Sequence, residues 1–445
     1  MVSMQHSNTS YDNIHPGLSQ ADALAILEAP LGELDAASDY YMAAAHLLNF
    51  PGAASEAALL RLVNNTAPEQ PVQLARRKAV EVLGRFGCQK AIPSIGRCLE
   101  SSDPYLVENA AWALQQLNCQ DATIHQALCK HLHNHGQSRR VLIQSLAGLG
   151  VQEALPAIQA LQSCDNPGVR GTALAAVARL SGDRSRLQEL EDHLTLPNQM
   201  DRQTAIQDLI DCGGCELLPS ILRAPVSPVF RMRALRALWP AGAQQHAGLE
   251  LLACLDTLLT DPPEQLVLVH RYDTEPSVAF LLGEFFGTDF SRSYLAWATL
   301  QQRDATEIWP ALWQRWQEDA HNDYGAHYFV IQLLGSMDGW PQQAEAAIEQ
   351  VLLGALRSTR PQFSKSKPAA CLALHRRAPH AWASGVGEWL SPRATRNWEL
   401  RYAACMGLTS AHQAGSLPEA GWREILNESE PDGFVAAKRQ LLISA

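Results

Sequence analysis

The sequence predicts an all-α protein, an α-solenoid of stacked helix pairs, and three observations support this fold class. Residues 87–120 contain two apolar helical patterns separated by a Ser-Ser-Asp-Pro turn at residues 101–104. Similar segments recur about every thirty residues, which is the period of a solenoid built from helix pairs. Apolar residues make up 47% of the 445 residues, enough for a large core. We therefore expect a curved superhelix of helix pairs with a concave groove for a ligand.

The pattern divides the chain into three parts. Residues 1–17 are rich in Ser, Asn, His and Pro and are expected to form a disordered lead. Regular helix-pair repeats are expected over residues 18–240. Residues 241–445 keep the helix-turn pattern with longer, Pro- and Trp-rich connections, and we interpret them as divergent helical repeats of the same solenoid. A separate second domain is the alternative for that half.

Each regular repeat closes its second helix with an apolar residue. These closing residues are Leu83, Leu114, Leu146, Val177, Leu209 and Leu238. One face of the helix expected near residues 104–117 is apolar at i, i+3, i+4 and i+7 and should be buried; it contains Val107, Ala110, Ala111 and Leu114. Glu108 and Trp112 lie on the opposite face, which should be solvated. A Trp beside a Glu on that face indicates a binding surface.

Composition and charge argue against several classes of function. The formal net charge of −11 disfavours nucleic acid as the main partner, because phosphate binding depends on clustered Lys and Arg. The ten cysteines occur singly, which is typical of free thiols in a reducing compartment. Zinc at the close pair Cys212 and Cys215 is an alternative, but we expect no metal site. The start of the chain lacks a signal-peptide pattern, and no apolar run approaches the ~20 residues of a membrane span. We expect a cytoplasmic protein.

Residues 270–273, His-Arg-Tyr-Asp, are the first candidate for chemistry. They follow the apolar run 266–269, where a helix is expected to give way to a turn. Asp273, Tyr272 and Arg271 can present a carboxylate, a phenol and a cation to one ligand. The alternative is an ordinary helix end, with Arg near its C-terminus and acidic residues before the next helix.

A second polar cluster stands at an expected helix start. Asp323 and Tyr324 precede His327, and Tyr324 and His327 are three residues apart, so that they should share one helix face. The alternative is a capped helix with partly buried aromatic residues.

Several segments resemble known families. Ala-Ile-Pro at 91–93, Ala-Leu-Pro at 154–156 and the segment 165–170 resemble the short HEAT-like repeat. The helix at 105–114, the segment 39–47 and the turn 271–273 further resemble the E/F clan of phycobilin lyases, HEAT-like proteins of cyanobacteria that attach bilins to phycobiliprotein cysteines. The likeness extends from end to end to single-chain members of about this length.

This resemblance implies a substrate and a reaction. Single-chain members attach phycoerythrobilin through a thioether to a cysteine of the phycoerythrin α-subunit, and some isomerise it to phycourobilin. For this chain that implies phycoerythrobilin as substrate, no permanently bound cofactor, and a nucleophilic thiolate on the acceptor protein. Isomerising relatives in the two-subunit phycoerythrocyanin system carry an Asn-His-Cys-Gln motif. Asn118-Cys119-Gln120 lacks the His, so this motif leaves isomerisation open.

The resemblance also implies site residues, because a linear tetrapyrrole is a long apolar body with two propionates and a row of pyrrole nitrogens. Asp273 would hydrogen-bond the nitrogens, Tyr272 would donate or relay a proton, and Arg271 would hold a propionate. The other residues expected to line the bilin groove are Tyr41, Glu108, Asn109, Trp112, Asp323, Tyr324, Trp398, Arg401 and Tyr402. A non-catalytic adaptor, or a chaperone for phycobiliprotein subunits, is the alternative in another functional class.

Overall fold

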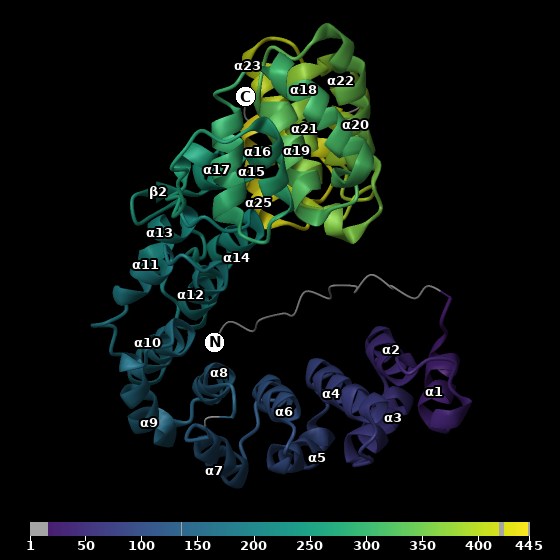
Figure 1. The fold of residues 1–445 in the computed structure, drawn as a ribbon, viewed down its shortest axis with the longest axis vertical. Helices are drawn as coiled ribbons and strands as arrows, with labels where there is room; N and C mark the ends of the chain where they lie inside the picture. Colours follow the sequence, from purple (N-terminus) through teal and green to yellow (C-terminus); the bar gives the residue numbers. More distant parts are fainter. Residues whose placement is uncertain (1–16, 135, 418–421, 444–445) are drawn as a thin grey trace. The chain divides into compact units, whose positions relative to one another are not determined.

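The computed structural model describes residues 17–134, 136–417 and 422–443, and these residues are largely helical (Figure 1). The predicted all-α class is confirmed; in the described residues one short ribbon, β1 (Gln245–His246) with β2 (Leu249–Glu250), is the exception. Residues 1–16 of the predicted lead lie outside the described residues. Contacts group the chain into two compact units, residues 1–187 and 188–445. The expected change from regular to divergent repeats at residue 240 stays a prediction.

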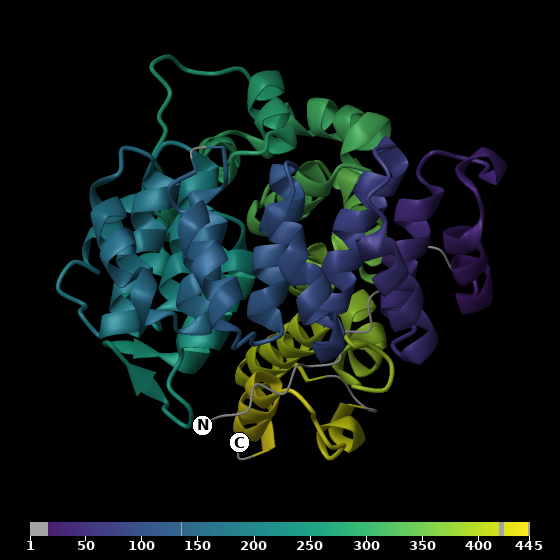
Figure 2. The same ribbon diagram turned by 90° about the horizontal axis from the view of Figure 1, so that it is seen from below.

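The first unit is a row of helix pairs. Its helices are α1 (Gln20–Glu28), α2 (Asp39–His46), α3 (Ala53–Asn64), α4 (Gln70–Arg85), α5 (Ile92–Arg97), α6 (Pro104–Gln116), α7 (Ala122–His131), α8 (Arg139–Leu149), α9 (Leu155–Ala160) and α10 (Pro167–Ser181). The second helices α2, α4, α6, α8 and α10 pack on one another in that order and form one layer. Figure 2 shows these blue and purple helices side by side.

The turns of this unit follow from their residue types. The Asp103 side chain accepts a hydrogen bond from the Tyr105 amide, and Pro104 occupies the first turn of α6, where its missing N–H costs nothing. Gly150 ends α8 with φ 73°, a left-handed conformation that glycine adopts without strain. The predicted apolar face of α6 is confirmed, because its four residues Val107, Ala110, Ala111 and Leu114 are fully buried.

The second unit has longer connections and a larger set of helices. They are α11 (Glu189–His193), α12 (Gln199–Asp211), α13 (Leu218–Leu222), α14 (Pro228–Leu238), α15 (Leu251–Thr260), α16 (Val278–Gly283), α17 (Phe290–Leu300), α18 (Ala305–Arg315), α19 (Tyr324–Ser336), α20 (Glu345–Arg357), α21 (Ser366–Arg377), α22 (Pro379–Leu390), α23 (Trp398–Gln413), α24 (Trp422–Leu426) and α25 (Gly433–Ile443). Within it α19, α21, α23 and α25 pack in sequence, and α15 contacts α14, α21, α23 and α25.

The core of the second unit combines aromatic rings with a buried ion pair. Phe329 lies within 5.2 to 5.4 Å, between ring centroids, of Phe285, Phe290 and Tyr294. Arg231 and Asp261 form an ion pair with 2% and 0% of their side chains exposed. The tryptophans that crowd this half of the sequence are mostly packing residues, and Trp297, Trp309, Trp340, Trp382 and Trp389 are all buried. Within the described ranges, no helix has the length and apolar character that crossing a membrane requires.

Candidate functional site

The turn at residues 270–273 precedes α16, as an irregular segment after the single 3-10 turn Pro263–Gln265. Arg271 and Asp273 each expose 91% of their side chains, and Arg271 Nε lies 3.9 Å from Asp273 Oδ1. This pair is open to solvent, where an ion pair contributes little to stability. His270 Nε2 instead lies 2.9 Å from Asp289 Oδ2. The helix expected to end at residues 266–269 is not present, because this segment is irregular, and presentation of Arg271 and Asp273 to one ligand stays a prediction.

The Tyr272 side chain packs against the protein, unlike the exposed side chains of Arg271 and Asp273. Its ring packs edge-on against Phe280 of α16, with 5.9 Å between centroids. Its hydroxyl is buried and has no hydrogen-bond partner in the described part of the chain. Burial, with the nearby charge of Glu284, raises the pKa of Tyr272 to about 12. The phenol therefore stays protonated at neutral pH and can donate a proton or a hydrogen bond.

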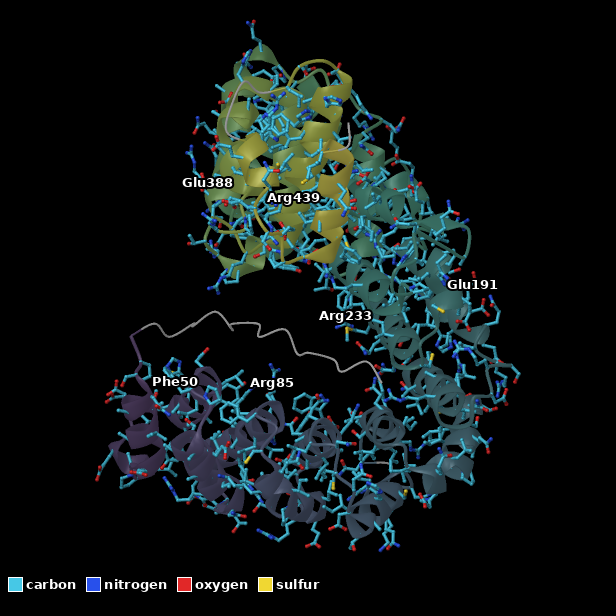
Figure 3. The ribbon with its side chains drawn as sticks, turned by 180° about the vertical axis from the view of Figure 1, so that it is seen from behind. Phe50, Arg85, Glu191, Arg233, Glu388 and Arg439 are labelled. Carbon is cyan, nitrogen blue, oxygen red and sulfur yellow. The ribbon has the colours of Figure 1, made fainter. Side chains whose placement is uncertain are left out.

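The predicted residues of the first unit lie together on α2 and α6. The Asn109 amide donates to the Arg77 carbonyl at 3.2 Å, and burial raises the pKa of Glu108. The Trp112 ring lies 5.9 Å from the Arg85 guanidinium, which projects from α4 (Figure 3). Tyr41 faces Lys78, also of α4, at 5.2 Å. Tyr41, Asn109 and Trp112 thus adjoin α4, whose cations are paired: Arg77 with Asp103, and Lys78 and Arg85 with Glu81. Glu108 instead neighbours the Ser138 backbone before α8, and binding of a bilin by these residues stays a prediction.

The exposure of this face differs from the sequence prediction. Glu108 and Trp112 are half-buried rather than fully solvated. A Cβ built on Gly84 would lie 3.2 Å from Trp112 Cζ3, so the missing side chain of Gly84 makes room for the ring. The reason is that neighbouring second helices pack directly against one another, which covers the flanks of each helix.

Asp323 and Tyr324 begin α19. Asp323 Oδ1 accepts from the amides of Gly325 and Ala326 at 2.8 Å each, so it is an N-cap. Tyr324 is 47% exposed, whereas His327 is 4% exposed and stacks on a neighbouring ring. The two side chains therefore differ in exposure, although both lie in the first turn of α19, and their role in binding stays a prediction. The capped helix, which the sequence left as the alternative, is what the structure contains.

The groove role expected of Arg401 and Tyr402 is not supported by their positions. Arg401 is 3% exposed and makes two bonds, of 3.0 and 2.7 Å, with the Glu430 carboxylate. Tyr402 is fully buried, and its hydroxyl donates to Asp256 Oδ1 at 2.9 Å. Trp398, which precedes them on α23, is half-buried under the guanidinium of Arg236 at 4.3 Å. Because α23 packs between α21, α22 and α25, its polar residues serve the interior.

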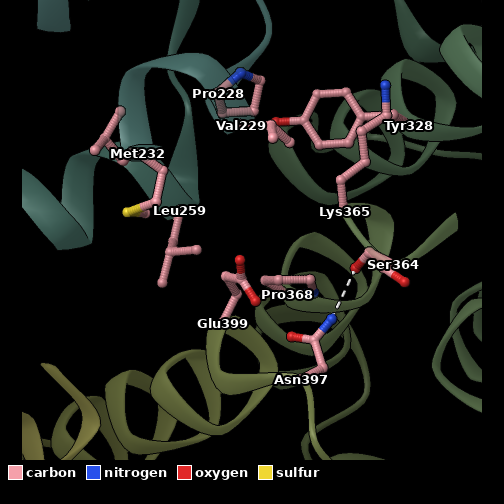
Figure 4. Close-up of a pocket in the computed structure, with 11 residues that line it drawn as sticks. Pro228, Val229, Met232, Leu259, Tyr328, Ser364, Lys365, Pro368, Asn397 and Glu399 are labelled. Carbon is pink, nitrogen blue, oxygen red and sulfur yellow. Dashed lines mark hydrogen bonds between the residues drawn. The ribbon is translucent and has the colours of Figure 1, made fainter. Parts of the chain in front are cut away.

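A pocket that the sequence reasoning missed lies in the second unit, among α14, α15, α19, α21 and α23 (Figure 4). Its volume is about 230 Å³. Two ionisable residues, Lys365 and Glu399, line it together with apolar side chains. The other lining residues are Pro228, Val229, Met232, Leu258, Leu259, Tyr328, Ser364, Pro368 and Asn397. No local motif marks them, because the five helices that bring them together are spread over almost two hundred residues.

Comparisons with known proteins agree with the architecture. A family model of HEAT repeats matches residues 67–136 and 125–210. The bilin biosynthesis protein CpeY of Synechococcus sp. (strain WH8020) is 39% identical over 414 residues, covering 93% of this chain and 99% of that protein. The chain belongs to the E/F clan of phycobilin lyases.

Two further proteins are similar to this E/F-clan chain over different lengths. An uncharacterized phycocyanin operon protein Y of Pseudanabaena tenuis (strain PCC 7409) is 36% identical, with 88% of this chain and 91% of that protein covered. The phycocyanobilin lyase subunit alpha of Thermosynechococcus vestitus (strain NIES-2133 / IAM M-273 / BP-1) is 30% identical over 41% of this chain and 72% of that protein.

The ten cysteines of this E/F-clan chain form no disulfide, and most of them are buried. Cys98, Cys254, Cys371 and Cys405 are buried. Burial raises the pKa of Cys371 and of Cys405 to about 12, which keeps both thiols protonated at neutral pH. A thiol in such surroundings is a poor nucleophile.

Proposed function

We propose that the chain is a phycobilin lyase that joins phycoerythrobilin through a thioether to a cysteine of the phycoerythrin α-subunit and isomerises it to phycourobilin. The observation that carries the proposal is the 39% identity to a bilin biosynthesis protein over nearly the whole of both chains. The phycocyanobilin lyase subunit alpha, 30% identical over 199 residues, supports the bond-forming activity.

The ligation adds the acceptor thiol across the ethylidene double bond of the bilin. A carbon–sulfur bond forms, the thiol proton is transferred to the conjugated system, and no group leaves. Asp273 supports this step in the proposal because its exposed carboxylate can accept hydrogen bonds from pyrrole N–H groups and stabilise the protonated chromophore. A protonated chromophore is more electrophilic, so a thiolate attacks it faster. Arg271, beside it, would bind a propionate.

Isomerisation moves a double bond, so one proton is added to the bilin and another is removed. Tyr272 would supply the added proton, because its phenol is protonated at neutral pH and its hydroxyl has no competing partner in the described residues. The proton released from the bilin then restores the phenol, so the isomerisation requires no oxidant or reductant. Tyr41, Glu108, Asn109, Trp112, Asp323 and Tyr324 stay predicted bilin contacts.

Co-expression tests the proposal. The chain is produced with bilin-synthesis enzymes and the phycoerythrin α-subunit, and the visible spectrum of the acceptor is recorded in acid urea. We expect bilin absorbance that survives denaturation, and at least a tenfold loss with Asp273→Asn. Asp338→Asn is the matched control, because Asp338 is a 79% exposed carboxylate paired to Arg376. Asp338→Asn should give the same bilin absorbance of the denatured acceptor as the wild type.

Other outcomes separate the alternatives. A chaperone or adaptor would give coloured native acceptor that loses its bilin in acid urea. A colourless acceptor from the wild-type chain would contradict the lyase proposal. Wild-type yield from Asp273→Asn would remove this residue from the mechanism and leave the ligation activity intact.

A further inference from the structure

Lys365 has an unusual environment for a lysine. It stands at the N-cap of α21, and its Nζ lies 3.5 Å from the centroid of the Tyr324 ring, 4.8 Å from that of Phe290 and 5.0 Å from that of Tyr328. Nζ is buried, and within the described ranges no atom accepts a hydrogen bond from it. An ammonium group carries three donors, and buried donors are almost always paired. An unpaired one therefore requires an explanation.

The carboxylates around Lys365 are already engaged. Asp261 accepts from Arg231, from the Tyr294 hydroxyl and, at 2.6 Å, from the Tyr328 hydroxyl. Asp323 is engaged by the two helix amides that it caps. Arg231 already balances Asp261, so Lys365 has the attraction of Asp261 and Asp323 but, in the described residues, no carboxylate hydrogen-bonded to its ammonium. Burial accordingly lowers the pKa of Lys365 to about 7, against the opposing attraction of Asp261 and Asp323.

Glu399 lines the same pocket, and among the described residues it has no ion-pair partner. It lies in the first turn of α23, and Figure 4 shows its carboxylate beside Leu259 and Pro368, away from the Lys365 ammonium. Burial raises its pKa. The two arginines that favour its charged form pair elsewhere, Arg236 with Asp432 and Arg401 with Glu430. The pocket thus offers a hydrogen-bond acceptor on one side and a cation on the other.

The remaining walls define what else the ligand must be. They are apolar, and the volume of about 230 Å³ is below the roughly 300 to 1,000 Å³ of pockets that enclose a drug-sized ligand. The pocket therefore suits part of a longer molecule. The matching part carries an anion, an N–H donor and apolar surface. A fatty acid has the anion and the apolar surface but no N–H, and it would leave Glu399 unpaired.

We propose that this pocket binds a propionate-bearing pyrrole ring of the bilin, with the propionate paired to Lys365 and the pyrrole N–H donating to Glu399. The remaining rings stay outside the pocket. The inference rests on the proposed bilin function, and it assigns to that function two residues that no sequence motif marks. The anion gives the Lys365 ammonium the hydrogen-bond acceptor that it lacks in the described residues, and the apolar walls cover the ring.

Binding of the free acid and of the dimethyl ester of phycoerythrobilin tests the inference, because the ester lacks the propionate charges. Both are titrated by visible absorbance into the purified full chain. We expect the wild type to bind the acid at least tenfold more tightly than the ester. Lys365→Met should lower this preference for the acid, leaving only the part that Arg271 contributes through the other propionate. Glu399→Gln should weaken the binding of the acid and of the ester by the same factor, because both compounds carry the same ring N–H.

Lys367→Met is the matched control, because Lys367 is a half-buried lysine two residues further along that does not line the pocket. It should keep the wild-type preference for the acid, and so should Lys365→Arg. Should Lys365→Met fail to fold, Lys365→Gln replaces it. A wild type that binds neither compound would contradict the bilin function itself. A wild type that binds both equally, or an acid preference that is as large in Lys365→Met as in the wild type, would overturn the pocket assignment alone.

Discussion

Replacing Asp261 by Asn should destabilise the second unit strongly. Asp261 and Arg231 are 0% and 2% exposed in their side chains, and Asp261 also accepts from the hydroxyls of Tyr294 and Tyr328. Asn has nearly the same shape and tolerates the left-handed backbone of this position, where φ is 50°. The substitution therefore removes the charge and leaves the geometry, so that Arg231 is buried without a counter-ion.

The size of the effect follows from that isolated charge. Removing one partner of a buried ion pair costs about 3 to 5 kcal/mol. For a unit of this size 1 kcal/mol shifts Tm by about 2 to 4 °C, so the transition should fall by about 10 °C. Differential scanning calorimetry measures it directly.

The double variant Arg231→Met with Asp261→Asn is the informative control. It removes both charges, and it should recover more than half of the lost Tm, because the penalty lies in the unpaired charge and not in the pair itself. A transition of Asp261→Asn within about 2 °C of the wild type would refute the reasoning, since the pair would then be solvated.

Three further predictions concern the site. Tyr272→Phe should keep the wild-type Tm, because the hydroxyl has no partner in the described residues, yet its product should be phycoerythrobilin instead of phycourobilin in acid urea; retained isomerisation would exclude the phenol. Lys365→Met should be more stable than the wild type by up to about 4 kcal/mol at pH 7, because the pKa of Lys365 falls from 10.5 to about 7 on folding. Between pH 7 and pH 10.5 the unfolded chain binds more protons than the folded chain, so the stability of the wild type rises with pH. Urea titrations should therefore show a smaller difference in unfolding free energy between Lys365→Met and the wild type at pH 10 than at pH 7; a constant difference would argue against a buried ammonium. Arg401→Met should lower Tm because the buried Glu430 carboxylate loses one of its two arginine partners and keeps only Arg439, and it should leave bilin affinity unchanged at temperatures below the transition; a folded variant that has lost bilin binding would return Arg401 to the site.

The parts of the structure that sequence could predict are those with local causes. The buried face of α6 follows from a 3.6-residue period within one helix, and the Asp103–Pro104 turn follows from the chemistry of two adjacent residues. The repeat period then extends this local pattern along the first unit. In these cases every interaction that decides the structure lies within one repeat of the sequence.

The errors have the opposite cause. Whether Arg401 and Tyr402 face a ligand or the interior depends on Glu430, which follows α23, and on Asp256, which lies 146 residues before Tyr402. Lys365 and Glu399 likewise become a site only when α14, α15 and α19 enclose them. Periodicity identifies an amphipathic helix, but the partner that covers each of its faces is a property of the tertiary packing.

The central claim, that this chain forms the bilin–cysteine bond, is tested most directly by the intact mass of the acceptor. Purified chain, phycoerythrobilin and apo phycoerythrin α-subunit are mixed, and the acceptor is analysed by mass spectrometry under denaturing conditions. We expect the acceptor to gain the mass of one bilin at a cysteine. The rate of this gain should depend on the presence of the chain and fall with Asp273→Asn. An acceptor whose mass is unchanged, or which gains bilin equally fast without the chain, would contradict it.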